Sequence, residues 1–204
     1  MNPNEIPIAG RKTPKDWYAF RESLRFTQDP ANWKKAYEEY FLTRLTTRYL
    51  KPIKMLDEHG SHEGEGFSIL AIICSLIEFL ESTIQGKNYR WRRPADNEYS
   101  SSKSLFISFL CKRHPFCTAF DPLLAERFYV GVRCAILHEA RLKDGWSLVA
   151  NGPAGVIINR DELIIYRINF QASLNKFIDW YGTALQSDHA LQAAFIRKFD
   201  SLCD

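Results

Sequence analysis

The chain has 204 residues, enough for one domain that buries a sizeable core without disulfides or metals. Hydrophobic residues make up 46% of the chain and charged residues 25%, which is the composition of a soluble globular protein. The formal net charge of +3 is too small to indicate a polyanionic partner by itself. The five cysteines include no CxxC pair, which argues against a disulfide framework or a zinc site.

The N-terminal residues 1–15 carry three prolines and no periodicity, so we expect an extended arm, docked through Ile6 and Ile8. The arm lacks the apolar core of a signal peptide. The longest apolar run, residues 67–80, is too short to span a bilayer and contains Glu78. We therefore expect a cytoplasmic protein without a membrane partner.

Apolar residues spaced three and four apart predict most of the chain to be helical. Asp29-Pro30 and Asp121-Pro122 each fit a helix cap followed by proline at the first helical position. Pro52 is expected to kink or end the second helix, with a short helical continuation to Glu58. The predicted helices are residues 17–26, 31–49, 67–85, 100–112, 123–146 (a helix ended by a turn), 169–185 and 189–202.

Residues 59–66, HGSHEGEG, read as a loop because of their glycines. The two histidines and two glutamates suggest a metal site, but the three glycines leave the ligands unordered, so we expect no metal and no cofactor. In the helix that follows, Glu78 lies among apolar residues. It is either an edge residue that faces solvent or a buried carboxylate, and burial would require a cationic partner.

The densest basic cluster is Tyr89-Arg90-Trp91-Arg92-Arg93. Arginines interleaved with aromatic residues can hold phosphates and stack on bases, so Arg90, Arg92 and Arg93 are candidate nucleic-acid-binding residues. The alternative is a solvated loop with its tryptophan tucked inward.

β-Branched runs at residues 156–158 and 163–166, separated by a polar turn, predict a β-hairpin with room for a third strand at 147–149. Helical periodicity returns after it. The sequence therefore predicts an all-α fold: a helical bundle, one domain over 1–204, with a hairpin insertion at 147–166 before the last two helices.

Arg133 and His138 stand five positions apart in the helix that begins at Asp121-Pro122. In an α-helix that spacing separates them by about 140° around the axis and about 7.5 Å along it. Two such residues can meet at one phosphate only through the reach of arginine or through a second copy of the helix. Cys134 and His138, four apart, could form a nucleophile pair, but the apolar neighbours favour a structural thiol.

The segment Arg133-Cys134-Ala135-Ile136-Leu137-His138, on a late helix of a helical protein, resembles the Arg-x4-6-His motif of the HEPN superfamily. The resemblance extends over roughly the central and C-terminal two-thirds of the chain. Members with this motif are typically metal-independent endoribonucleases, toxins of toxin–antitoxin pairs or parts of phage-defence systems, and they usually dimerise around it.

The resemblance implies that His138 moves a proton and that Arg133 stabilises the charged phosphorus centre. It also implies that the protein is bacterial, that its substrate is RNA and that it forms a homodimer. An antitoxin or a defence-system protein would be its partner. Glu78, Glu139 and Arg141 would support the site.

Many active members have a polar residue, often asparagine, where this chain has Cys134. A catalytically inactive relative that binds RNA or protein is therefore the alternative. An unrelated helical protein without a link to nucleic acid is the third reading.

Overall fold

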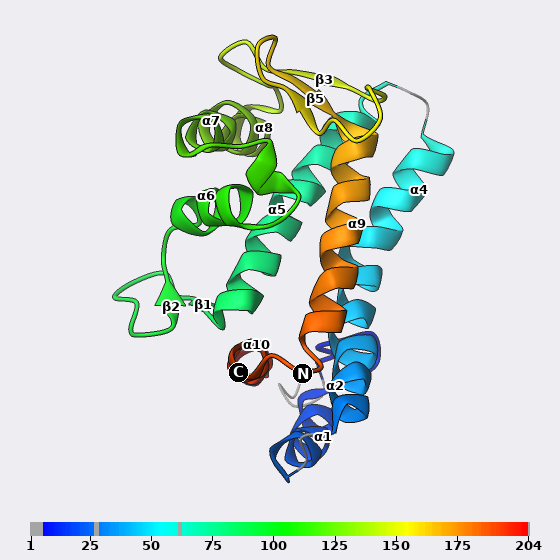
Figure 1. Cartoon of the computed structure of the whole chain (residues 1–204), viewed down its shortest axis with the longest axis vertical. Helices are drawn as coiled ribbons and strands as arrows, with labels where there is room; N and C mark the ends of the chain where they lie inside the picture. The colour runs from blue at the N-terminus through cyan, green and yellow to red at the C-terminus, as the bar shows by residue number, and fades with distance from the viewer. Residues whose placement is uncertain (1–5, 27–28, 61–62, 204) are drawn as a thin grey trace. The chain divides into compact units, whose positions relative to one another are not determined.

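The structure is a computed structural model, which describes residues 6–26, 29–60 and 63–203. Residues 1–5 of the N-terminal arm and Ser61 and His62 of the glycine-rich loop lie outside the described residues. The fold is mainly α with two small sheets (Figure 1). The predicted helical class is thus confirmed in outline, and the HEPN type stays a prediction.

The residues group into two compact units. Unit 1 contains Met1–Pro52, Ser82–Ser100 and Asp179–Asp204, and unit 2 contains Ile53–Glu81 and Ser101–Ile178. Three of the four boundaries fall inside helices, α4, α5 and α9, whose bounds are Lys51–His59, Glu65–Gln85 and Arg167–Ala184. The fourth lies between Ser100 and Ser101, outside any helix. The single domain expected over residues 1–204 stays a prediction.

Unit 1 begins with α1 (Pro14–Phe26) and a long helical stretch that runs from Pro30 into α4. Asp29 caps this stretch by accepting a hydrogen bond from the Ala31 N–H, as predicted. The stretch passes Pro52 without ending, and a π-helical segment ends at Leu50, two residues before that proline. Its segments are α2 (Pro30–Ala36), η2 (Tyr37–Leu42), α3 (Thr43–Leu45), η3 (Thr46–Leu50) and α4.

The core of unit 1 is aromatic. Trp17 packs edge-on against Tyr40 at 5.1 Å, and Phe195 stacks on Phe199 of α10 (His189–Ser201) at 4.4 Å between ring centroids. The N-terminal arm docks on α3 and η3, where Arg48 donates a hydrogen bond to the Pro7 carbonyl. Ile8 is buried there, whereas Ile6, expected to dock with it, is 50% exposed.

A two-stranded parallel pair, β1 (Asn88–Tyr89) and β2 (Glu98–Tyr99), closes the basic loop in unit 1. The sequence predicts only a loop there. Strands of two residues carry too little periodicity to be recognised from sequence.

Unit 2 contains most of α5, with α6 (Lys103–Lys112), a short 3₁₀ turn η4 (Phe116–Thr118) and the helix that carries Arg133. That helix consists of α7 (Pro122–Phe128), a π-helical segment η5 (Tyr129–Cys134) and α8 (Ala135–Glu139). A phenylalanine cluster fills the core between these elements and α9: Phe106, Phe109, Phe116, Phe128, Phe170 and Phe177.

The predicted hairpin is present, with β4 (Ile158–Asn159) antiparallel to β5 (Ile164–Tyr166). The third strand, β3 (Ser147–Val149), pairs in parallel with β5, giving the order β3-β5-β4. The turn between β4 and β5 contacts the start of the candidate-site helix, because Arg160 in that turn pairs with Asp121.

Helix α5 is 21 residues long, so by length and composition it could cross a membrane, contrary to the expectation from residues 67–80. The helix is longer than the apolar run because polar residues at both ends of the run are also helical. About 56% of its apolar window is buried inside the protein, as in the core helix of a soluble protein. A cytoplasmic location stays a prediction.

Candidate functional site

The helix that carries Arg133 and His138 is fixed at its start by Asp121. The Asp121 carboxylate accepts a hydrogen bond from the Leu124 N–H at 2.9 Å and also pairs with Arg160. The Leu124 N–H, which would have no partner inside the helix, lowers the pKa of Asp121, and Arg160 adds to the effect. Capping and a buried apolar face together set where this helix lies.

The same helix ends earlier than the sequence predicts, at Glu139. Ala140 adopts a left-handed conformation with φ 53°, and the Lys143 N–H donates a hydrogen bond to the Gly131 carbonyl at 2.9 Å. The chain thus folds back on the helix and buries Trp146 against Phe128. His138 therefore lies in the last turn of the helix.

Of the two motif residues, Arg133 is the one whose side chain is held by contacts with its neighbours. Its Nη2 lies 3.3 Å from Glu78 Oε2 of α5, and both side chains are about one-fifth exposed, 19% and 20%. The guanidinium also lies over the Tyr129 ring, 5.5 Å from its centroid. Of the two alternatives for Glu78, the structure therefore contains the carboxylate paired with a cation.

Arg133 keeps its charge in this setting. Burial lowers the pKa of its guanidinium, but the nearby Tyr129, Glu78 and Cys134 outweigh that effect, and the pKa is raised. Its Nε atom has no hydrogen-bond partner within the described residues. Because guanidinium has five N–H donors, Arg133 retains donors beyond those that face Glu78.

His138 is exposed on α8, and among the described residues no hydrogen bond or ion pair involves it. It is not buried against its apolar neighbours, as an unrelated structural histidine would be. Arg133 lies in η5 and His138 in α8, so the interval between them is mostly α-helical and directs the side chains to different sides. One copy of the helix therefore does not bring the two residues to one point.

The supporting residues Glu139 and Arg141 pair with each other. Arg141 Nη2 lies 2.9 Å from Glu139 Oε2, and Lys143 contacts the other carboxylate oxygen. These two cations, Lys143 first, lower the pKa of Glu139. Both residues are exposed at the end of α8, next to His138.

Sequence reasoning missed the most buried carboxylate of unit 2, Glu81, one turn after Glu78. Its side chain is fully buried and accepts hydrogen bonds from Ser108 Oγ at 2.7 Å and from Arg113 Nε and Nη2 at 2.8 and 2.9 Å. The only signal in the sequence was a second glutamate in a strongly apolar helix.

The basic cluster has its tryptophan outward. Trp91 is 73% exposed, which contradicts the inward tryptophan of the solvated-loop alternative. Arg90 pairs with Glu98 at 3.0 Å, whereas Arg92 and Arg93 are exposed and have no hydrogen bond or ion pair in the described part of the chain. This cluster belongs to unit 1 and the motif helix to unit 2.

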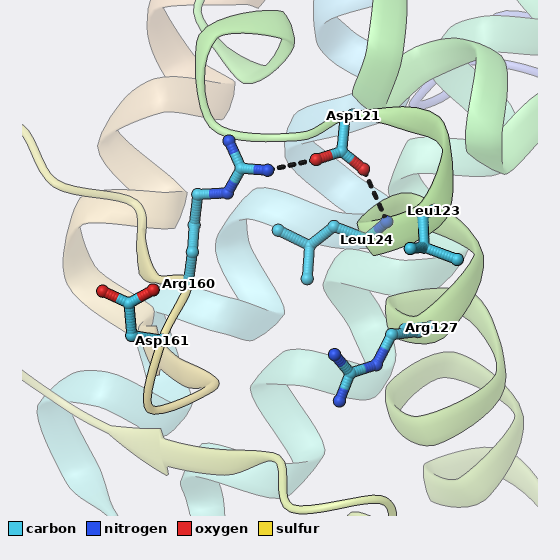
Figure 2. A pocket seen from close by; sticks show the side chains of 6 residues that line it. All are labelled: Asp121, Leu123, Leu124, Arg127, Arg160 and Asp161. Atoms are coloured by element: carbon cyan, nitrogen blue, oxygen red, sulfur yellow. Dashed lines mark hydrogen bonds and ion pairs between the residues drawn. The ribbon is translucent and has the colours of Figure 1, made fainter.

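Among the described residues, each unit contains a pocket whose lining includes neither Arg133 nor His138. The pocket of unit 2, about 220 Å³, lies between the start of α7 and the β4–β5 turn. Figure 2 shows the Arg160–Asp121 pair on one side of it and Arg127 on the other. Arg160 is thus engaged by Asp121, the residue that caps α7. The pocket is therefore lined by residues that hold the start of α7 in place.

A metal site and a cysteine–histidine nucleophile pair each require their side chains to lie close together. Within the described residues no group of three His, Cys, Asp or Glu side chains could hold a metal ion. Cys134 is partly exposed rather than buried as expected, and it forms no hydrogen bond with His138 among the described residues.

A scan against family models, a search of curated proteins and a search of solved structures each find no match to this chain. The function is therefore argued from the motif helix and its surroundings.

Proposed function

We propose that this protein is a metal-independent endoribonuclease of HEPN type, acting as a homodimer. The observation that supports the proposal is the pair of environments on one helix. Arg133 is held by Glu78 and Tyr129 with its charge retained, and His138 stands exposed five residues later. A fixed cation and an accessible titratable group are what cleavage through the 2′-hydroxyl requires.

The chemistry assigns one role to each residue. His138 moves a proton, because an imidazole ring can both accept and donate one. Arg133 donates hydrogen bonds to the phosphate oxygens and stabilises the charge that develops at phosphorus. The 2′-hydroxyl attacks the adjacent phosphate, and the products carry a 2′,3′-cyclic phosphate and a 5′-hydroxyl.

The position of the two side chains supports the proposed homodimer. Because one helix directs them apart, Arg133 of one copy would act with His138 of the other. The motif helix also leaves three large apolar residues exposed, Leu123, Val130 and Leu137, at 73%, 47% and 47%. Apolar surface next to His138 favours contact with a second copy, although scattered exposed residues alone are common.

A second candidate function is an inactive relative that binds RNA or protein. The contact between Arg133 and Glu78 favours it, because a guanidinium engaged by a carboxylate is less available to a phosphate. Under either candidate the proposal includes a cytoplasmic protein with an antitoxin or defence-system partner.

The test compares RNA cleavage by four single variants in EDTA. Arg133→Ala and His138→Ala are expected to reduce the rate at least a hundredfold, the size of a lost general acid–base or charge-stabilising group. Arg127→Ala and His59→Ala, exposed residues of the same types, serve as matched controls and should cleave like the wild type.

Equal cleavage by His138→Ala and His59→Ala would contradict the assigned role of His138. If none of the proteins cleaves RNA, the binding module replaces the enzyme. Sedimentation velocity of the same samples gives the oligomeric state, and an active monomer would contradict the shared site.

A further inference from the structure

The loop between β1 and β2 presents a tryptophan to solvent on a fixed base. Trp91 is 73% exposed, whereas Trp17, Trp33 and Trp146 are buried. We name residues 90–97 the tip loop; in Figure 1 it extends away from the two short strands. A single exposed indole needs no explanation by itself, so its surroundings carry the argument.

The base of the tip loop is held by hydrogen bonds within unit 1. The Glu98 carboxylate accepts the Ala95 N–H at 2.7 Å and Arg90 Nη1 at 3.0 Å, and these contacts, the backbone one first, lower the pKa of Glu98. The Arg90 N–H donates to the Tyr99 carbonyl at 2.8 Å. Because the loop is already ordered, a ligand that contacts its tip bears little ordering cost.

Two further arginines are left at the tip. Arg92 and Arg93 are exposed, and neither forms a hydrogen bond or an ion pair within the described residues. Arg93 adopts φ 50°, which turns the chain directly after Arg92. An open indole face beside two guanidinium groups without carboxylate partners combines a stacking surface with phosphate donors.

We propose that the tip loop binds an unpaired RNA strand, with a base stacked on Trp91 and neighbouring phosphates contacted by Arg92 and Arg93. The inference deepens the proposed function by naming unpaired RNA as the substrate class. It rests on the proposed function only for the choice of RNA as the ligand. Arg90, tied to Glu98, is a positioning residue. Stacking on an exposed ring requires a base that is free of its duplex.

A membrane surface is the competing ligand for a loop of tryptophan and arginine. The tip loop has one large apolar side chain and also carries the exposed Asp96, and Glu98 of β2 follows it directly. One indole side chain offers little apolar area to bury in a bilayer, whereas it is enough for a base to stack on. The loop therefore fits RNA better than a bilayer.

The test measures fluorescence anisotropy of a short, labelled, unstructured RNA and of its duplex, with His138→Ala protein in EDTA so that no RNA is cut. Trp91→Ala is expected to weaken single-strand binding by about tenfold to a hundredfold. Trp180→Ala, which removes a 48%-exposed tryptophan of α9, is the matched control and should bind like its parent.

The salt dependence separates the two kinds of contact. Arg92→Ala should make the slope of log K against log salt shallower by about 0.7, the value of one phosphate contact to a single strand. Trp91→Ala should leave that slope unchanged. Equal affinity for duplex and single strand, or no loss in Trp91→Ala, would overturn the proposal.

Two outcomes distinguish this inference from the proposed function. RNA binding that depends on Trp91, together with no cleavage by the wild type, supports the tip loop and removes the enzyme. Cleavage with RNA affinity unchanged in Trp91→Ala does the reverse. Binding to phosphatidylserine–phosphatidylcholine vesicles that depends on Trp91, without any effect on RNA, would overturn the inference in favour of a membrane.

Discussion

Glu81 shows how a single buried charge is made tolerable in unit 2. Its carboxylate is fully buried, and two N–H groups of Arg113 and the Ser108 hydroxyl occupy its oxygens. Such a pair contributes little net stability when intact, but removing one partner leaves a charge with no compensation.

We expect Glu81→Ala to lower the free energy of unfolding by about 3 kcal/mol. Urea denaturation followed by circular dichroism measures the change. Glu58→Ala, which breaks an exposed pair with Lys54, should cost less than about 0.5 kcal/mol. A loss in Glu81→Ala as small as that of the control would show that Arg113 is compensated elsewhere.

The sequence predicts that a buried Glu78 needs a cationic partner. It does not determine whether Glu78 faces solvent or pairs with Arg133. That choice depends on α5 and η5 lying side by side, a contact 55 positions apart in sequence. Glu81 was missed for the same reason, since its partners come from α6 and the residue just after it. The outward Trp91 depends on the short β1–β2 pair.

The element that most determines the candidate site is the turn that ends the motif helix. Gly131 lies where a side chain would collide with the returning chain, because a Cβ atom there would lie 2.7 Å from Trp146 Cδ1 and 3.1 Å from the Lys143 carbonyl oxygen. The close approach lets the Lys143 N–H bond to the Gly131 carbonyl. The π-helical segment around Gly131 is of the kind often found at functional sites.

Gly131→Ala should therefore destabilise the protein by about 1–3 kcal/mol through overpacking. Thermal and urea unfolding measure the effect. Gly66→Ala is the matched helical control, because its added methyl would meet only the end of the Leu148 side chain, at 3.2 Å. That control should be neutral or slightly stabilising. A neutral Gly131→Ala would mean that the turn shifts freely.

Element boundaries divide into those that local chemistry fixes and those that it does not. Asp29-Pro30 and Asp121-Pro122 gave the starts of two helices, since a cap and a proline act locally. The end of the motif helix at Glu139 and the passage of the helix through Pro52 depend on packing and on π-helical turns, which leave no periodic signal.

At the scale of the whole molecule, the tyrosines of unit 1 make its stability sensitive to alkaline pH. Burial raises the pKa of Tyr40 to about 12, and it raises the pKa of Tyr181 further. Both are buried, whereas an unfolded chain ionises tyrosine near pH 10. The folded state thus holds more protons than the unfolded state above pH 10, so stability is complete below that pH and falls as pH rises.

We expect the free energy of unfolding to be constant with respect to these groups up to about pH 10 and then to fall. The slope is at most about 1.4 kcal/mol per pH unit for each buried tyrosine. Tyr181→Phe should make the slope shallower by up to that amount. Urea titrations between neutral pH and pH 11 would contradict this if the variant and the wild type lost stability in parallel.

The helical class, the hairpin before the last two helices and the candidate motif helix could all be predicted from periodicity and turn residues. The two units could not, because three of their four boundaries fall inside continuous helices, where composition does not change. The only sequence signal for the proposed homodimer is the separation of Arg133 and His138 on their helix.

The central claim is that the protein cleaves RNA without a metal, with the 2′-hydroxyl of the RNA as the nucleophile. End-group analysis of RNA treated with wild-type protein in EDTA tests it most directly, with the same RNA carrying 2′-O-methyl groups as the second substrate. The account predicts 2′,3′-cyclic phosphate ends from RNA, none with His138→Ala, and no cleavage of the methylated strand. Cleavage of the methylated strand, or activity lost in EDTA and restored by a divalent cation, would contradict it.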